Sequence, residues 1–132
     1  MKTKQFNSEF RSDIIVHIVG KDDYRYDVLN PLFDDMGFGF VLPNSNIVVI
    51  DGERGLTKHE LKWVEAHEMA HLILNHTEER NEKHEEQADT MAWILLINKG
   101  YDKAAKLIVK HYKERHGKDF DKYLLHYQKS KL

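Results

Sequence analysis

The 132-residue chain is long enough to bury one hydrophobic core and too short for two independent ones, so we expect a single domain over residues 1–132. Its 20 basic and 22 acidic side chains nearly balance. This balance argues against direct binding to nucleic acid or to an acidic membrane surface, because no large field of one sign is available. Cysteine is absent, which excludes disulfides, thiolate zinc sites and a cysteine nucleophile. Histidine, aspartate and glutamate remain as the strong metal ligands.

The sequence gives no indication of a membrane partner. Its first residues are basic, but no apolar stretch follows them, and no later segment is apolar over the length that crosses a bilayer. We therefore expect a soluble protein of the cytoplasm.

The first half of the chain predicts short strands. Residues Asp13–Val19 are rich in β-branched side chains, and Gly37–Leu42 and Ile47–Ile50 have the pattern of two further strands. The turn-forming residues 43–46 between the last two predict a hairpin. Residues 21–36 are polar, aromatic and interrupted by a proline, and they are expected to be irregular or weakly helical.

The second half of the chain predicts helices. Thr57, followed three residues later by Glu60, predicts a capping box at the start of a helix over Lys58–Asn75. Apolar residues occupy nearly the whole circumference of this helix, which is typical of a buried central helix. After a charged loop at 76–81, further helices are expected over Glu82–Lys99 with Gly100 as a left-handed cap, Asp102–His116, and Lys118–Lys129. Strands followed by helices predict an α+β fold, with a small and mainly antiparallel sheet packed on the central helix.

The predicted central helix carries the run His67-Glu68-Met69-Ala70-His71. Two histidines four residues apart lie on one face of a helix, one turn above the other, so both imidazoles can hold one metal ion. Glu68 is rotated to the flank of that face, where its carboxylate can reach a metal-bound water without ligating the metal. His67 and His71 are therefore candidate metal ligands, and Glu68 is the candidate general base.

A catalytic zinc ion needs a third protein ligand. The apolar stripe of the next predicted helix, extended one turn toward its N-terminus, reaches Glu85 and includes Asp89, so both acids are expected to face inward. Glu86 aligns with the edge of that stripe and His84 falls off it, so Glu85 is preferred and the other two are alternatives. Asp89 is expected to accept a hydrogen bond from the second ring nitrogen of a ligating histidine, with His67 preferred.

The run from His67 to His76, followed by Glu85-x-x-Ala88-Asp89, resembles the ImmA/IrrE-type metallopeptidases and the wider gluzincin class. The resemblance implies a minimal zincin-like domain with helices for the motif, for the glutamate and at the C-terminal end. It further implies that Zn²⁺ is held by His67, His71 and Glu85, that Asp89 supports a histidine, and that Glu68 activates water.

The segment before the motif also resembles the cytosolic parts of membrane-bound HtpX-like peptidases, although the membrane helices of that group are missing here. The chain departs from the ImmA/IrrE pattern in two respects. The gap from His71 to Glu85 is short, which leaves less room for a substrate-binding loop. Gln87 and Met91 replace an acid and an aromatic residue that are common in that family.

These features predict a zinc-dependent metallopeptidase that hydrolyses peptide bonds, with Glu68 activating a zinc-bound water. One strand of the expected hairpin, Ile47–Ile50, could present an edge to which an extended peptide or protein substrate adds. The resemblance implies a regulatory protease whose substrate is a DNA-binding repressor. Two other hypotheses stay open: a catalytically silent zinc-binding interaction or sensor module, and a metal-free helical scaffold with a fortuitous motif.

Other polar residues are candidates for supporting roles. His76 lies about 140° from the ligand face if the helix continues, and it is expected to cap the helix end. The third predicted helix and its start carry side chains that could donate a hydrogen bond to a tetrahedral oxyanion, where a donor can contribute several kcal/mol. These candidates are Tyr101, His111, Tyr112 and His116. The sequence does not choose among them, and an ordinary structural role is favoured for each one individually.

Overall fold

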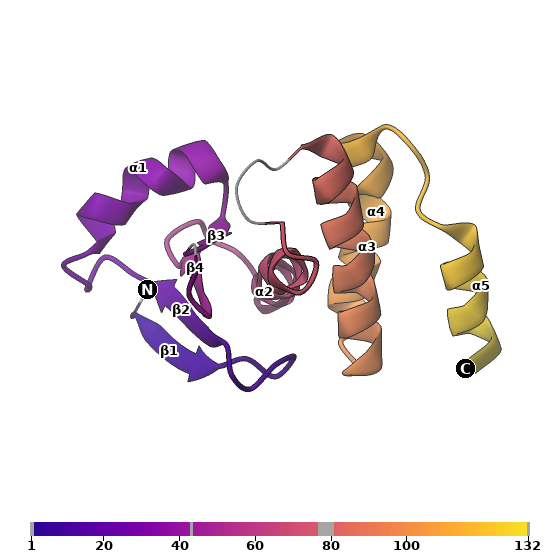
Figure 1. The fold of residues 1–132 in the computed structure, drawn as a ribbon, viewed down its shortest axis with the longest axis horizontal. Coiled ribbons are helices and arrows are strands. Elements are labelled where there is room, and N and C mark those ends of the chain that lie inside the picture. The colour runs from indigo at the N-terminus through magenta and orange to yellow at the C-terminus, as the bar shows by residue number, and fades with distance from the viewer. Residues whose placement is uncertain (1, 43, 77–80, 132) are drawn as a thin grey trace.

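The computed structural model describes residues 2–42, 44–76 and 81–131, which form one four-stranded sheet and five helices (Figure 1). Within those residues, no helix combines the length and the apolar character that a membrane span requires. The elements in chain order are β1 (Lys4–Asn7), β2 (Ile15–Val19), α1 (Tyr26–Met36), β3 (Gly39–Val41), β4 (Ile47–Asp51), α2 (Lys58–Ile73), α3 (Glu82–Asn98), α4 (Asp102–His116) and α5 (Lys122–Lys131).

The sheet is mixed and has the strand order β1-β2-β4-β3. The pairs β1–β2 and β3–β4 are antiparallel, so the expected hairpin forms, whereas β2 and β4 run parallel. The α+β class is therefore confirmed. The expectation that Ile47–Ile50 presents an edge is wrong, because this segment is β4 and both of its sides pair with other strands. The edge beside β4 belongs to β3.

Helices cover both faces of the sheet. On one face, Val48 and Ile50 of β4 pack with Met69 of α2, and on the other face Val49 packs with Phe33 of α1 and with Phe40 of β3. Because both faces are buried, residues 47–50 of β4 are all apolar rather than alternating. This packing fixes β3 and β4 directly against the central helix.

Helix α2 lies between the sheet and the α3–α4 pair, and Figure 1 views it nearly end-on. It begins at the predicted capping box, in which Thr57 accepts a hydrogen bond from the Glu60 N–H and the Glu60 carboxylate accepts one from the Thr57 N–H. Residues 65–71 are all buried, so the expectation of a buried central helix is confirmed. The histidine motif therefore sits in the middle of the fold.

Three elements differ from the sequence-based expectation. Strand β1 was not predicted, and within the residues expected to be irregular or weakly helical, Tyr26–Met36 form the helix α1, which contains Pro31. The last helix begins at Lys122 rather than Lys118. Of the expected charged loop at 76–81, positions 77–80 lie outside the described residues.

Candidate metal centre

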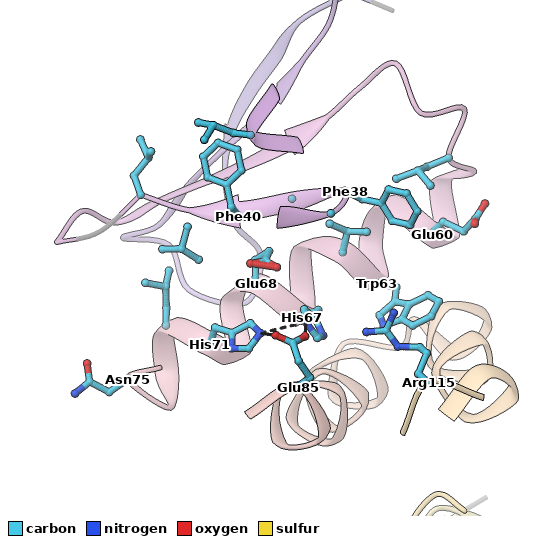
Figure 2. Close-up of a pocket in the computed structure, with 18 of the residues that line it drawn as sticks. Phe38, Phe40, Glu60, Trp63, His67, Glu68, His71, Asn75, Glu85 and Arg115 are labelled. Atoms are coloured by element: carbon cyan, nitrogen blue, oxygen red, sulfur yellow. Dashed lines mark hydrogen bonds and ion pairs between the residues drawn. The ribbon is translucent and has the colours of Figure 1, made fainter. Parts of the chain in front are cut away.

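Three side chains from two helices converge at the centre of the molecule. His67 and His71 project from one face of α2, and Glu85 reaches them from the first turn of α3 (Figure 2). The Nε2 atoms of the two histidines lie 3.1 Å apart, and the Glu85 carboxylate lies 2.9 Å from His67 Nε2 and 3.2 Å from His71 Nε2. One ligand atom from each residue falls within 4.8 Å of the others, so the three could hold a metal ion.

Asp89 orients His67 through Nδ1, the ring nitrogen that does not face Glu85. It lies one turn after Glu85 on α3, is fully buried, and has its Oδ1 2.7 Å from His67 Nδ1. The same oxygen accepts a hydrogen bond from Trp63 Nε1 at 3.2 Å, while Oδ2 contacts Arg115 Nε at 3.0 Å and His116 Nε2 at 2.6 Å. The contact expected between Asp89 and His67 is thus present, and it leaves Nε2 of His67 facing Glu85.

The acids and the histidine shift one another's pKa. Burial by itself lowers the pKa of His67, but the hydrogen bonds to Asp89 and Glu85 outweigh it and raise the pKa to about 9. Burial by itself raises the pKa of both acids, but the contacts with the histidines hold the pKa of Glu85 and of Asp89 well below the ordinary range. Both carboxylates are therefore ionised at neutral pH, which suits a cation between Glu85 and the imidazoles.

A pocket of about 900 Å³ opens over the three residues. Glu68 lines it and is only 3% exposed, and Figure 2 shows its carboxylate on the side of α2 that faces β3. Much of the remaining lining is apolar and comes from residues outside α2: Leu32, Phe38, Phe40, Val41, Leu42 and Leu56. The site therefore combines a polar floor on α2 with an apolar surround.

Strand β3 approaches α2 closely because it carries a glycine. A Cβ at Gly39 would lie 2.9 Å from Val64 Cγ1, 3.1 Å from the Val49 carbonyl oxygen and 3.5 Å from Glu68 Cγ. The first two separations are tighter than ordinary van der Waals contact, so a side chain at this position would force the strand or its neighbours to move. The absence of a side chain at Gly39 brings the backbone of β3 directly above Glu68.

The outer side of β3 carries backbone groups that β4 does not use. The Phe38 carbonyl oxygen and the Leu42 N–H bond to β4, at 2.9 and 3.1 Å. Since bonding directions alternate along an antiparallel strand, Gly39 and Val41 direct their N–H and C=O groups to the other side. Among the described residues, no further strand pairs with that side. An extended polypeptide could therefore pair with β3 beside the pocket.

Neither family models, nor curated protein sequences, nor solved structures match this chain. What the site can do is therefore inferred from its own donor atoms, burial and cavity. Two imidazoles and a carboxylate can hold a divalent ion, and a buried glutamate beside them can take up and release a proton.

The alternative third ligands, Glu86 and His84, lie away from His67 and His71. Glu86 pairs with Lys118 at 2.9 Å near the surface. The ring of His84 stacks on His76 with 4.0 Å between centroids. Of the three candidates, Glu85 alone contacts both His67 and His71.

His76 does not occupy the position expected for it. Helix α2 ends at Ile73, and the ring of His76 turns back so that its Nδ1 lies 3.1 Å from Nδ1 of His71. The expectation that the ring caps the helix end, far from the ligand face, is therefore wrong. It assumed a continuous helix through Asn75, whereas Asn75 has a left-handed backbone conformation with φ of 60°.

None of the four side chains considered as oxyanion donors lines the large pocket. Tyr101 bonds to Glu9, His111 stacks on Trp63, Tyr112 is buried beside Thr90, and His116 contacts Asp89. Arg115, which no sequence pattern indicated, lines the pocket instead.

The guanidinium carbon of Arg115 lies 5.3 Å from the centroid of the Trp63 ring, and Figure 2 shows the two side chains together at one end of the pocket. The contact with Asp89 uses Nε, so the two terminal amino groups of Arg115 remain as donors beside the pocket.

Proposed function

We propose that the chain is a zinc-dependent metallopeptidase that hydrolyses peptide bonds in extended segments of polypeptide. The observation that carries the proposal is the convergence of His67, His71 and Glu85 in a pocket that also holds the buried carboxylate of Glu68. A catalytic zinc site has three protein ligands and an open position, whereas a structural site is closed by four. Three ligands beside a pocket support the first kind.

The donor atoms suit zinc in both type and spacing. Tetrahedral zinc with bonds of about 2.0–2.1 Å holds its ligand atoms about 3.3 Å apart. The two Nε2 atoms lie 3.1 Å apart, and Glu85 lies 2.9 Å from His67 Nε2 through Oε2 and 3.2 Å from His71 Nε2 through Oε1. One ligand atom from each residue therefore falls within 4.8 Å of the other two, which is the scale of a metal site. The same two-histidine, one-carboxylate set can hold ferrous iron in oxygenases. Glu68 favours hydrolysis, because a buried base next to the ligands has a direct use in activating water.

Each polar residue of the site then has a defined role. A bound zinc ion supplies a water with a pKa lowered to about 7 and polarises the scissile carbonyl. Glu68 takes the proton from the attacking water and delivers it to the leaving amine. Asp89 keeps the proton of His67 on Nδ1, so that Nε2 faces the ligand position. Arg115 can donate a hydrogen bond to the substrate carbonyl as negative charge develops on its oxygen.

The proposed substrate is an extended peptide segment that pairs with the outer side of β3. Gly39 and Val41 supply the backbone groups for this pairing, and the apolar surround of the pocket accepts apolar side chains near the scissile bond. On the resemblance to ImmA/IrrE-type peptidases, we propose that a DNA-binding repressor is one such protein substrate, and that the enzyme acts in the cytoplasm without binding nucleic acid itself.

A set of four proteins tests the proposal: the wild type, Glu68→Gln, Glu85→Gln, and Glu86→Gln as a matched change on the same helix. We expect about one equivalent of zinc in the wild type, in Glu68→Gln and in Glu86→Gln, and much less in Glu85→Gln. Cleavage of a peptide library and of candidate repressors should fall by about 100-fold or more in Glu68→Gln. Glu86→Gln should cleave as the wild type does.

Two results would decide against the proposal. Zinc-loaded wild type and Glu68→Gln that are equally inert would favour a silent interaction or sensor module. A wild type with well under one equivalent of zinc, unchanged by Glu85→Gln, would contradict both the zinc peptidase and the silent zinc-binding module. Iron bound in place of zinc would likewise contradict the proposal, and the protein would then be assayed for oxidation.

A further inference from the structure

His76 reaches His71 through the way in which α2 ends. The N–H of His76 donates to the His71 carbonyl at 2.9 Å, and the N–H of Asn75 donates to the Leu72 carbonyl at 3.1 Å. These two bonds around a left-handed residue form a Schellman motif, in which the side chain two positions past the cap meets the one three positions before it. Those two side chains are His76 and His71.

The two ring nitrogens of His71 face different partners. Nε2 faces Glu85 Oε1 at 3.2 Å and His67 Nε2 at 3.1 Å, which is the direction of the proposed metal. Nδ1 lies 3.1 Å from Nδ1 of His76. A neutral imidazole that ligates through Nε2 carries its proton on Nδ1, so His71 donates this proton to His76.

The direction of that hydrogen bond determines which ring nitrogen of His76 carries the proton. Its Nδ1 must accept, so its proton is on Nε2, which lies 3.0 Å from Oε1 of Gln87 on α3. A glutamine oxygen can only accept, so donor and acceptor roles agree in both hydrogen bonds, from His71 to His76 and from His76 to Gln87. The ring of His84 stacks on His76 at 4.0 Å, with an interplanar angle of 14°, and covers its other side.

We propose that His76 and Gln87 are positioning residues that hold His71 in the tautomer whose Nε2 can bind a divalent metal ion. Helix α3 then orients both ligating histidines, through Asp89 for His67 and through Gln87 and His76 for His71. The inference rests on the proposed metal site, but it concerns the tautomer of a ring and can be tested without metal as well.

Zinc affinity provides the first test, measured by competition with a chromogenic chelator. His76→Phe keeps a ring of similar size and removes the acceptor, so we expect zinc to bind about 10–100-fold more weakly. Gln87→Leu should weaken binding by a smaller factor. His76→Gln, which restores an acceptor, should recover most of the affinity. His59→Phe, the same change on α2 outside the pocket, should have no effect.

The double variant His76→Phe with Gln87→Leu separates a relay from two independent effects. Because Gln87 acts through His76, its removal should cost nothing further once His76 is phenylalanine. Equal losses from Gln87→Leu in both backgrounds would overturn the relay. Zinc affinity of His76→Phe within about threefold of the wild type would also overturn it, since changes behind a ligand normally cost more.

Nitrogen NMR of the His71 ring in the zinc-free protein keeps this test separate from the proposed function. We expect a protected Nδ1–H proton on His71 in the wild type and its loss in His76→Phe. That result supports the relay even if the protein binds no zinc, in which case only the proposed function fails. A wild-type His71 that carries its proton on Nε2 alone would overturn the relay whatever the zinc content.

Discussion

Replacing Asp89 by asparagine would test how the protein holds its first histidine. The carboxylate is fully buried and meets four donors, two on each oxygen. Asparagine has nearly the same size, but only one of its two terminal atoms accepts hydrogen bonds, and the other is an NH₂ group. In the variant, one of the two pairs of donors must therefore face the NH₂ group, which is itself a donor.

The orientation of the new amide decides whether zinc affinity or the stability of the fold falls more. If its oxygen stays with Arg115 and His116, its NH₂ group faces Nδ1 of His67 and drives the ring proton to Nε2, the ligand atom. We then expect zinc affinity to fall by about 100-fold, the upper end for a change behind a ligand. In the opposite orientation the NH₂ group faces the N–H donors of Arg115 and His116. The Arg115 side chain is 39% exposed, so water screens the loss of the ion pair. Leaving donors opposite the buried position of Asp89 without an acceptor costs about 1–3 kcal/mol, a sizeable share of the total stability of a small domain.

Chelator competition measures the first effect, and urea unfolding of the zinc-free protein measures the second. Glu86→Gln is the control, because it makes the same chemical change on the same helix in a pair with the exposed side chain of Lys118. Asp89→Asn that matched the control in both measurements would refute the reasoning, since it would mean that neither the charge nor the acceptor of Asp89 is used.

Four further outcomes follow from the structure. Zinc should bind about tenfold more tightly for each pH unit between pH 7 and 9, because His67, with its pKa raised to about 9, must release the proton on Nε2 before it can bind the metal. Calorimetry in buffers of different ionisation enthalpy would measure the number of protons released on zinc binding. The zinc-free protein should lose stability over the same pH range in urea titrations. The raised pKa of His67 stabilises the fold fully below the unfolded value of 6.5, and this contribution is lost as the pH passes about 9. A zinc affinity or a stability that does not change with pH would contradict the contacts assigned to His67. Gly39→Ala should lower kcat/KM for peptides more than zinc affinity and cost about 1–3 kcal/mol in urea, because its Cβ would meet Val64 and displace β3; unchanged cleavage would count against β3 as the docking strand. Thr57→Ala should cost about 1 kcal/mol in urea with zinc affinity unchanged, whereas Thr57→Ser should retain the cap.

Features contained within one helix could be predicted from the sequence. The capping box at Thr57, the common face of His67 and His71, and the inward register of Glu85 and Asp89 depend on the helical period and on local hydrogen bonds. The strands that become β2, β3 and β4 were predicted for a similar reason, because their β-branched and apolar composition is local.

Features that depend on packing could not be predicted. Strand β1 is mostly exposed and has no apolar alternation to reveal it. The segment of α1 could be predicted only as irregular or weakly helical. The helix forms despite Pro31 because Tyr26 and Phe33 bury one of its faces against the sheet. The position of His76 depended on a single left-handed residue, Asn75, which no periodicity predicts.

The sequence by itself determined which donors the chain offers and which of them share a helix face, because helical geometry places residues four apart together wherever the helix lies. Only the tertiary structure decided that α3 crosses α2 with the carboxylate of Glu85 between both imidazoles, and that β3 rather than β4 is the edge above Glu68. These placements depend on how the apolar faces of separate elements pack. Many side chains distant in sequence contribute to that packing at once, and no local pattern encodes it.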